Sequence, residues 1–258
     1  MKLNKHIDLI ILTVYPIIAA IFSLTIKPNA LLSVFIFFGI PSIFLSFRQP
    51  AHIKKAALFS LVGIPALVFI DYIAHITRAW LVPNSVFPFR LFGYVTIENI
   101  IWIFFHLYLV VIYFEHFVAH HFRDKLIQSK TKYLFLLVFS IFTFFLALYY
   151  FKPQMLYIRY WYMVFGLIFI LIPIILERLA FPKVFTKILK VAPFFVYLLL
   201  IYEITALKLN WWSFPGQEFI GWITFFDITF PLEEMVFWII LFAISILSFY
   251  EYFDENEK

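Results

Sequence analysis

Long apolar runs separated by short polar breaks divide the chain. The runs lie near residues 7–26, 30–47, 56–77, 96–118, 132–151, 157–177, 190–208 and 230–250. Each has about the 20 residues that a helix needs to cross the hydrocarbon core of a bilayer. No small-residue cleavage site follows the first run, so we expect it to be a retained helix and not a signal peptide. The pattern predicts an all-α, polytopic membrane helical bundle with about eight transmembrane helices.

The composition strengthens this prediction. Hydrophobic residues make up 64% of the 258 residues and charged residues only 14%, whereas an ordinary soluble domain carries roughly 25% charge. The aromatic share of 23%, including 37 Phe, indicates that rings line much of what the bundle encloses. The absence of Cys excludes disulfides, thiolate metal sites and cysteine nucleophiles.

The positions of Lys and Arg predict the topology. The N-terminus, alternate loops and Lys258 on one predicted side hold 14 of the 20 Lys and Arg, and the loops on the other side hold six. Because cytoplasmic loops of membrane proteins are enriched in these residues, we expect a multi-pass cell-membrane protein with both termini in the cytoplasm. The net charge of +5 therefore reports topology, and we expect membrane lipids and no nucleic acid as partners.

An internal repeat is the main organisational feature. An acid followed by Ala after three residues and by Trp after nine occurs at Asp71 and, 132 residues later, at Glu203. An acid with Trp four residues later occurs at Glu98 and, 136 residues later, at Glu234. The spacing predicts two tandem four-helix repeats in the same orientation, 1–125 and 126–258, related by an axis along the membrane normal. The basic segment 121–132 is the expected linker.

Five acidic residues are predicted to meet at the outer end of the bundle: Asp71, Glu98, Glu203, Glu233 and Glu234. Charged groups inside a membrane are costly, so they are candidates for function. Like charges in a poorly hydrated site cannot all ionise, so at least one of these groups is expected to be protonated and able to act as a general acid. We take all five as catalytic candidates.

The Glu233-Glu234 pair also has a purely structural interpretation. Pro231 followed by Glu is an ordinary beginning of a helix, where carboxylates meet the positive end of the helix dipole. Adjacent residues on a helix point about 100° apart, so at most one of the two glutamates should face a cleft.

Aromatic residues and one histidine accompany the acids. The tryptophans of the outer loops, among them Trp211, are consistent either with an interfacial aromatic belt or with the cap of a cavity. Trp102 and Trp238 lie one turn after an acid, and the face of such a ring can stabilise a carbocation. His75, one turn after Asp71, either orients that acid or is simply its partner. The substrate-binding candidates are Trp80, Trp102, Trp212, Phe237, Trp238 and His75.

The remaining motifs are weaker indications of a catalytic or metal-binding function. Glu115-His116 followed by His120 and His121 has a spacing that could bind a metal, but no second histidine cluster completes a site, so contact with lipid headgroups is the favoured interpretation. Glu115, Glu177 and Glu251, near the cytoplasmic interface, are expected to be structural. Walker-type, nucleophile-elbow and dinucleotide motifs are absent, and we expect neither a metal nor a cofactor.

These residues together resemble the membrane-integral lycopene cyclases of the heterodimeric or fused type. The resemblance covers 56–118 and 190–250 most clearly. Its strongest element is Phe230-Pro231-Leu232-Glu233-Glu234 with Phe237 after it, preceded by Glu203 to Trp212 and by Gly221. The resemblance implies a carotenoid biosynthesis enzyme, an intramolecular lyase or isomerase that cyclises the linear end groups of lycopene or a related carotenoid by acid catalysis without net redox change. It also implies a lipid-soluble carotenoid substrate and other membrane enzymes of the carotenoid pathway as partners.

The chain departs from this pattern in its first half. Thr96-Ile97-Glu98-Asn99 lacks the Pro and the second Glu, which leaves open whether only the second half is catalytic, whether the product differs, or whether cyclisation has been lost. One alternative is a hydratase-like enzyme of the same membrane class, and another is a proton-coupled transporter or binding protein. A transporter needs a polar path, whereas a cyclase needs a long apolar groove that ends at the acids.

Overall fold

A computed structural model of the protein describes residues 5–119 and 130–253. Within these ranges, seven helical segments are long and apolar enough to cross a membrane, and the chain is an integral multi-pass membrane protein. They are α1 (Lys5–Ile26), α2-η1-α3 (Ala30–Val34, Phe35–Gly39, Ile40–Arg48), η2-α4 (Pro50–His52, Ile53–Ile76), α5 (Ile97–Phe117), α6 (Thr131–Phe151), α7-η4-α8 (Trp161–Phe165, Gly166–Leu171, Ile172–Ala180) and η5-α11 (Glu234–Leu241, Phe242–Tyr252).

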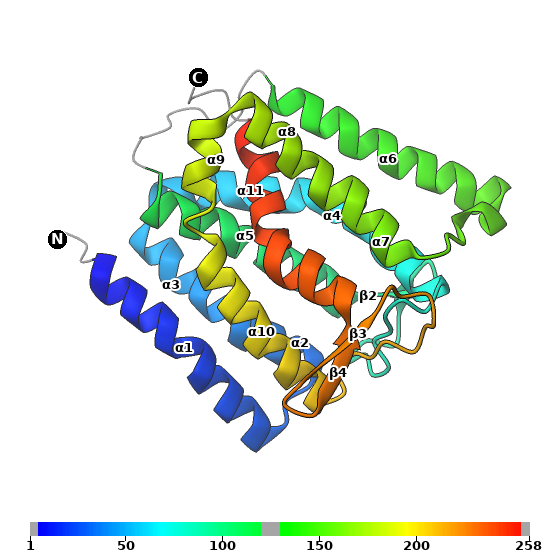
Figure 1. Ribbon diagram of the computed structural model, residues 1–258, viewed down its shortest axis with the longest axis horizontal. Coiled ribbons are helices and arrows are strands. Elements are labelled where there is room, and N and C mark those ends of the chain that lie inside the picture. Colours follow the sequence, from blue (N-terminus) through cyan, green and yellow to red (C-terminus); the bar gives the residue numbers. More distant parts are fainter. Residues whose placement is uncertain (1–4, 120–129, 254–258) are drawn as a thin grey trace.

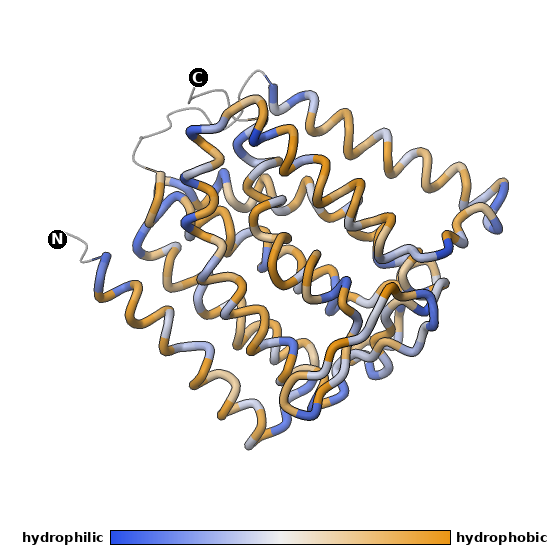
Figure 2. Tube along the Cα trace, in the orientation of Figure 1, coloured by the Kyte–Doolittle hydropathy of each residue, from blue (hydrophilic) through white to orange (hydrophobic). Residues whose placement is uncertain are grey.

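The predicted helical membrane bundle is confirmed, with one qualification on the count of spans. The helices α9 (Pro182–Ile188) and α10 (Ala192–Lys208) meet at an angle of 41°, and the described residues contain eight spans when this bent pair is counted as one. Apolar residues run along the helices, and polar residues gather at their ends (Figure 2).

The bundle has a buried centre and lipid-facing edges. The spans α5 and η5-α11 are the most buried, whereas α1 and α6 are the least buried and lie at opposite edges (Figure 1). The beginning of α1 and the end of α11 lie at one end of the bundle, and the strands lie at the other end. The central helices α4 and α5 therefore pack along most of their length and can hold a site between them.

The second and sixth spans have the same local construction. Each contains a π-helical segment, η1 or η4, followed by a nine-residue α-helix that has Pro at its second position, Pro41 or Pro173. Each α-helix ends at a residue of nearly the same backbone conformation, Gln49 with φ −134 and ψ 59 or Phe181 with φ −137 and ψ 64. These positions are 132 residues apart, the spacing of the predicted repeat.

The ends of α4 and α10 also correspond. Arg78 (φ 61) and Asn210 (φ 54) are left-handed, and the following N–H of Ala79 or Trp211 bonds the carbonyl of Ala74 or Ala206 at 2.8 and 3.0 Å. Left-handed residues with this bonding terminate helices as Schellman motifs. Just beyond, Leu81 and Ser213 form an isolated antiparallel bridge with each other. The two residues are 132 positions apart, which is the spacing of the predicted repeat; the repeat itself stays a prediction.

Two short hairpins that the hydrophobic pattern did not predict precede the acidic helices. β1 (Arg90–Leu91) pairs with β2 (Val95–Thr96), and β3 (Trp222–Phe225) pairs with β4 (Ile228–Pro231). The second hairpin turns at Phe226 and Asp227, which both have positive φ, whereas Asn-Gly or Asp-Gly is the usual sequence of such turns. Each hairpin leads directly into a helix that begins beside the acids.

Candidate functional site

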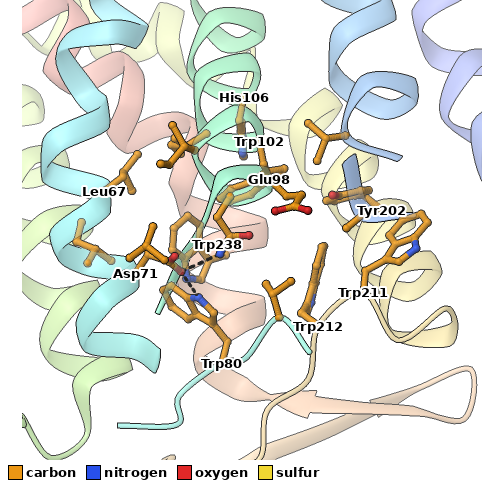
Figure 3. Close-up of a pocket in the computed structure, with 18 of the residues that line it drawn as sticks. Leu67, Asp71, Trp80, Glu98, Trp102, His106, Tyr202, Trp211, Trp212 and Trp238 are labelled. Atoms are coloured by element: carbon orange, nitrogen blue, oxygen red, sulfur yellow. Dashed lines mark hydrogen bonds between the residues drawn. The ribbon is translucent and has the colours of Figure 1, made fainter. Parts of the chain in front are cut away.

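A cavity of about 90 Å³ lies in the bundle near the hairpin end. Figure 3 shows acidic and aromatic side chains from α4, α5 and α10 around it. Most of its lining is apolar or aromatic. Of the predicted site residues, its lining includes Asp71, Trp80, Glu98, Trp102, Glu203, Trp212, Glu234 and Trp238, together with Trp211 from the same loop.

Three predicted site residues do not line the cavity: His75, Glu233 and Phe237. Glu234 lines the cavity and Glu233 does not. This is expected on a helix, where adjacent side chains point about 100° apart, so that only one of the two can face a cleft. Phe237 packs at Gly166 instead, where a Cβ would lie 2.2 Å from the Phe237 ring. The Phe237 ring thus fills the gap between η5 and η4 and not the cavity, and its role in binding substrate stays a prediction.

The second half contributes a pair of neighbouring carboxyl groups. Glu203, on α10, and Glu234, on η5, are both buried, lie next to each other and line the same cavity. Trp212 Nε1 donates to Glu203 Oε1 at 2.9 Å, and the Tyr162 hydroxyl donates to Glu234 Oε2. Two neighbouring carboxyl groups that are both buried cannot both ionise, so the Glu203–Glu234 pair holds at least one proton.

The first half holds a different set of bonds, which we call the Asp71 cluster: Asp71, His75, Trp80 and Asn99. Trp80 Nε1 and Asn99 Nδ2 donate to Asp71 Oδ1 at 2.6 and 2.9 Å. His75 Nδ1 lies 2.9 Å from the backbone oxygen of Asp71 and 3.3 Å from Oδ1. His75 is therefore a partner of Asp71 and does not contact the cavity directly.

The glutamates that precede Asn99 and Glu234 bind the loops at the hairpin end of the bundle. Glu98 Oε1 accepts from the Val86 N–H at 2.5 Å, and its Oε2 accepts from Ser85 Oγ at 2.9 Å. Glu233 Oε1 accepts from the Ile220 N–H at 2.6 Å. These carboxylates hold the loops at the beginning of their helices, which is the structural role that the sequence left open for the second motif.

This bonding corrects the predicted alignment of the two halves. Glu98 corresponds to Glu233, and Asn99 corresponds to Glu234, at a spacing of 135 residues, whereas the tryptophans Trp102 and Trp238 are 136 apart. The cause is η5, a π-helical segment, because a π turn takes one more residue than an α turn. Matching the motifs through their tryptophans therefore shifted the acids by one position.

The tryptophans are components of the site. Trp80 and Trp212 donate to buried acids, and Trp211 Nε1 donates to the Pro28 carbonyl at 2.9 Å. The cavity interpretation therefore fits these three better than an aromatic belt does. The Trp102 and Trp238 rings lie 5.5 Å apart, and their Nε1 atoms have no hydrogen-bond partner within the described part of the chain.

Tyr162, Asn99, His106 and Tyr202 also belong to the site, and sequence reasoning missed them. Tyr162 is one of 15 tyrosines, and only the packing of α7 against η5 distinguishes it. Asn99 was missed because the sequence comparison matched Glu98, and not Asn99, with Glu234. His106 offered a signal, because it is a histidine inside a span. It is fully buried and stacks on Phe38 with ring centroids 5.2 Å apart.

A separate polar cluster ties helix ends together at the opposite end of the bundle. Asp8 bonds Arg48 at 2.8 Å and His116 at 3.0 Å, and the Tyr250 hydroxyl donates to Glu115. The expected headgroup contact is wrong for His116, because this side chain is buried against Asp8. His120 and His121 lie outside the described residues. Glu177 and Glu251 are buried near the ends of α8 and α11.

Among the residues that the structure describes, no three His, Cys, Asp or Glu side chains are grouped so as to hold a metal ion. Comparisons of the chain with protein-family models, with curated proteins and with solved structures give no match. Its function is therefore inferred from the residues of the site.

Proposed function

We propose that the protein is a membrane enzyme of carotenoid biosynthesis, similar to the lycopene cyclases, which cyclises the linear end of lycopene or a related carotenoid by acid catalysis. The observation that carries this proposal is the Glu203–Glu234 pair, two buried carboxyl groups that cannot both ionise and that line an apolar, tryptophan-lined cavity. A buried acid next to an apolar ligand can act as a general acid.

The reaction needs one proton donor and one proton acceptor. The donor protonates the terminal double bond, which leaves a tertiary cation. The neighbouring double bond attacks this cation and closes the ring, and the cation moves to a ring carbon. Loss of a proton from an adjacent carbon to a carboxylate then forms the final double bond. Atoms and electrons balance without an oxidant or reductant, and the carboxyl groups of the cavity supply both proton steps.

The lining of the cavity favours cation chemistry over the alternatives. Trp80, Trp102 and Trp238 present rings whose faces can stabilise a carbocation. A mostly apolar lining excludes water, which argues against quenching of the cation by hydration. A proton-coupled transporter needs a polar path, whereas the lining of this cavity is mostly apolar.

The size of the cavity places a condition on substrate binding. Its volume of about 90 Å³ is smaller than the cavity of about 150 Å³ that accommodates benzene in another protein. A carotenoid end group is larger than benzene and does not fit this volume. Side chains or helices must therefore move apart to admit a carotenoid end group.

The orientation of the protein follows from the distribution of its charges. We infer that both termini face the cytoplasm and that the hairpins and the cavity lie toward the outer side, because the cytoplasmic side of membrane proteins carries the excess of Lys and Arg. The substrate would then reach the acids from within the lipid, with no need for a soluble domain.

The first prediction is a pigment conversion. Expression of the protein in a bacterial host that accumulates lycopene should convert lycopene to cyclic products, detected by chromatography. Glu234→Gln should reduce conversion by roughly 100-fold or more, as expected for loss of a general acid. Glu218→Gln is the matched control, since Glu218 forms an exposed ion pair with Arg159 at 3.0 Å. Lack of conversion by wild-type protein that is present in the membrane would refute the proposed activity.

A further inference from the structure

The two halves of the site differ at one pair of corresponding positions. Asn99 and Glu234 each follow a glutamate that binds a loop at the hairpin end, and each contacts the acid of its own half. Asn99 presents an amide to Asp71, whereas Glu234 presents a carboxyl group to Glu203. An amide donates N–H but does not exchange a proton with its partner as a carboxylic acid does.

The Asp71 cluster and the Glu203–Glu234 pair differ in the number of protons bound to their carboxyl groups. Asp71 Oδ1 accepts from the Trp80 and Asn99 N–H groups, so no bond that Asp71 makes requires a proton of its own. Asp71 Oδ2 has no hydrogen-bond partner among the described residues, although Asp71 is only 7% exposed. Asp71 thus keeps a free acceptor atom, whereas the Glu203–Glu234 pair holds at least one proton.

One aromatic ring connects the two clusters. Trp80 donates to Asp71, and its ring centroid lies 5.2 Å from that of Tyr162, whose hydroxyl donates to Glu234. The same indole lies 5.6 Å from the Trp238 ring. Asp71 and Glu234 therefore line one cavity, with an indole ring in contact with both clusters.

We propose that the site is an asymmetric acid–base pair, in which the Glu203–Glu234 pair donates the proton and Asp71 accepts it, with Asn99 as the residue that positions Asp71 as the acceptor. This assignment rests on the proposed function. In one turnover the proton leaves the glutamate pair for the terminal double bond, and a proton from the new ring reaches Asp71 Oδ2. Exchange with solvent after product release restores both groups.

The proton arrangement can be tested without any substrate. Infrared spectra of the purified protein in lipid should show the C=O stretch of a protonated carboxylic acid, shifted in D₂O. Glu203→Gln and Glu234→Gln should each remove this band, because the carboxyl group that remains then has no second carboxyl group beside it and can ionise. Asp71→Asn should leave the band, and Asn99→Glu should add a second one. A band that is lost in Asp71→Asn and retained in both glutamine variants would overturn the assignment.

Isotope incorporation tests the two catalytic roles. With lycopene in D₂O, Asp71→Asn should lower ring formation by about 100-fold yet still place deuterium at the terminal double bond of recovered substrate, because protonation is reversible. Glu234→Gln should give neither ring nor deuterium. Asn99→Ala should lower kcat by roughly 10-fold with little change in KM, and Asn99→Gln should restore part of it. Equal deuterium in both acid variants would overturn the division of roles.

The two experiments separate the two proposals. If the infrared bands follow the expected pattern but no pigment is converted, the proton arrangement stands and the proposed cyclisation fails. If pigment is converted but the band follows Asp71, the cyclisation stands and the assignment of donor and acceptor fails.

Discussion

The tryptophans of the loops at the hairpin end hold the acids of the cavity in place. Trp80 and Trp212 each reach back nine residues to donate to the acid of the preceding helix. A buried carboxyl group that loses such a partner keeps its desolvation cost, which is about 1–3 kcal/mol. The indole N–H groups therefore contribute to stability as well as to the geometry of the site.

We predict that Trp212→Phe lowers the free energy of unfolding by about 1–3 kcal/mol, because the ring is kept while the donor to Glu203 is lost. The midpoint of reversible denaturation in mixed micelles measures this change. Trp222→Phe is the control, since Trp222 is exposed on β3 and should change the midpoint little. Equal effects of the two substitutions would contradict the prediction.

Residue pairings of this kind were only partly predictable from the sequence. The acid followed by Trp nine residues later indicated Asp71–Trp80 and Glu203–Trp212 correctly, because both partners lie on one helix and its adjacent loop. Tyr162 could not be assigned to Glu234, since the two are 72 residues apart and belong to different spans. Local spacing carries no information on such contacts.

At the scale of the helices, π-helical segments set which side chain reaches the cavity. The segment η5 begins at Glu234 and contains Phe237 and Trp238. Its extra residue separates the loop-binding Glu233 from Trp238 by five positions, whereas the α-helical α5 separates Glu98 from Trp102 by four. Both tryptophans still line the cavity. The π segment thus allows the second half to present an acid and a tryptophan together.

The contact between η4 and η5 gives a prediction. A Cβ on Gly166 would lie 2.2 to 2.4 Å from atoms of the Phe237 ring, so Gly166→Ala should push this ring out of place and destabilise the protein by about 1–3 kcal/mol. Thermal unfolding of the solubilised protein measures the loss.

Gly221→Ala is the control for this substitution, because the nearest atoms there are 3.8 Å from the added carbon and no clash results. A Gly166→Ala variant as stable as the wild type would show that the Phe237 ring can move at no cost.

The elements themselves were predictable to different degrees. Runs of about 20 apolar residues are a strong signal for spanning helices, and the predicted ranges agree with the structure within a few residues, except at the bent pair α9 and α10. The π-helical segments leave the apolar pattern unchanged, so they could not be predicted from the sequence. The second hairpin was missed because Phe226-Asp227 lacks the glycine that usually marks such a turn. The first hairpin has Gly93 in its turn, but its strands of two residues each are too short to give an alternating pattern.

At the scale of the whole molecule, the arrangement of the ends bears on topology. The beginning of α1 and the end of α11 lie at the same end of the bundle, away from the hairpins (Figure 1). An even number of spans requires this, and the bent pair α9 and α10 must then count as one span. The side of the membrane on which these ends lie stays a prediction from the Lys and Arg distribution.

The absence of native Cys permits a direct test of topology. In intact cells, a membrane-impermeant thiol reagent should label Asn84→Cys in an outer loop but label Lys183→Cys only after the membrane is permeabilised. Both positions are exposed. The reverse pattern would place the hairpins and the cavity on the cytoplasmic side and would contradict the charge argument. Labelling is followed by a mass shift on gels.

The bridge between Leu81 and Ser213 has a consequence for the ancestry of the protein. In the predicted repeat, Leu81 and Ser213 occupy the same position of the two halves. Contact between the same residue of two subunits is what identical subunits make across the two-fold axis of a homodimer. In such a dimer, any substitution would alter both copies of the site together. Once two copies share one polypeptide, each can change independently. The predicted repeat therefore implies that the amide of Asn99 and the carboxyl group of Glu234 belong to a fused chain, in which no symmetry keeps the two positions identical.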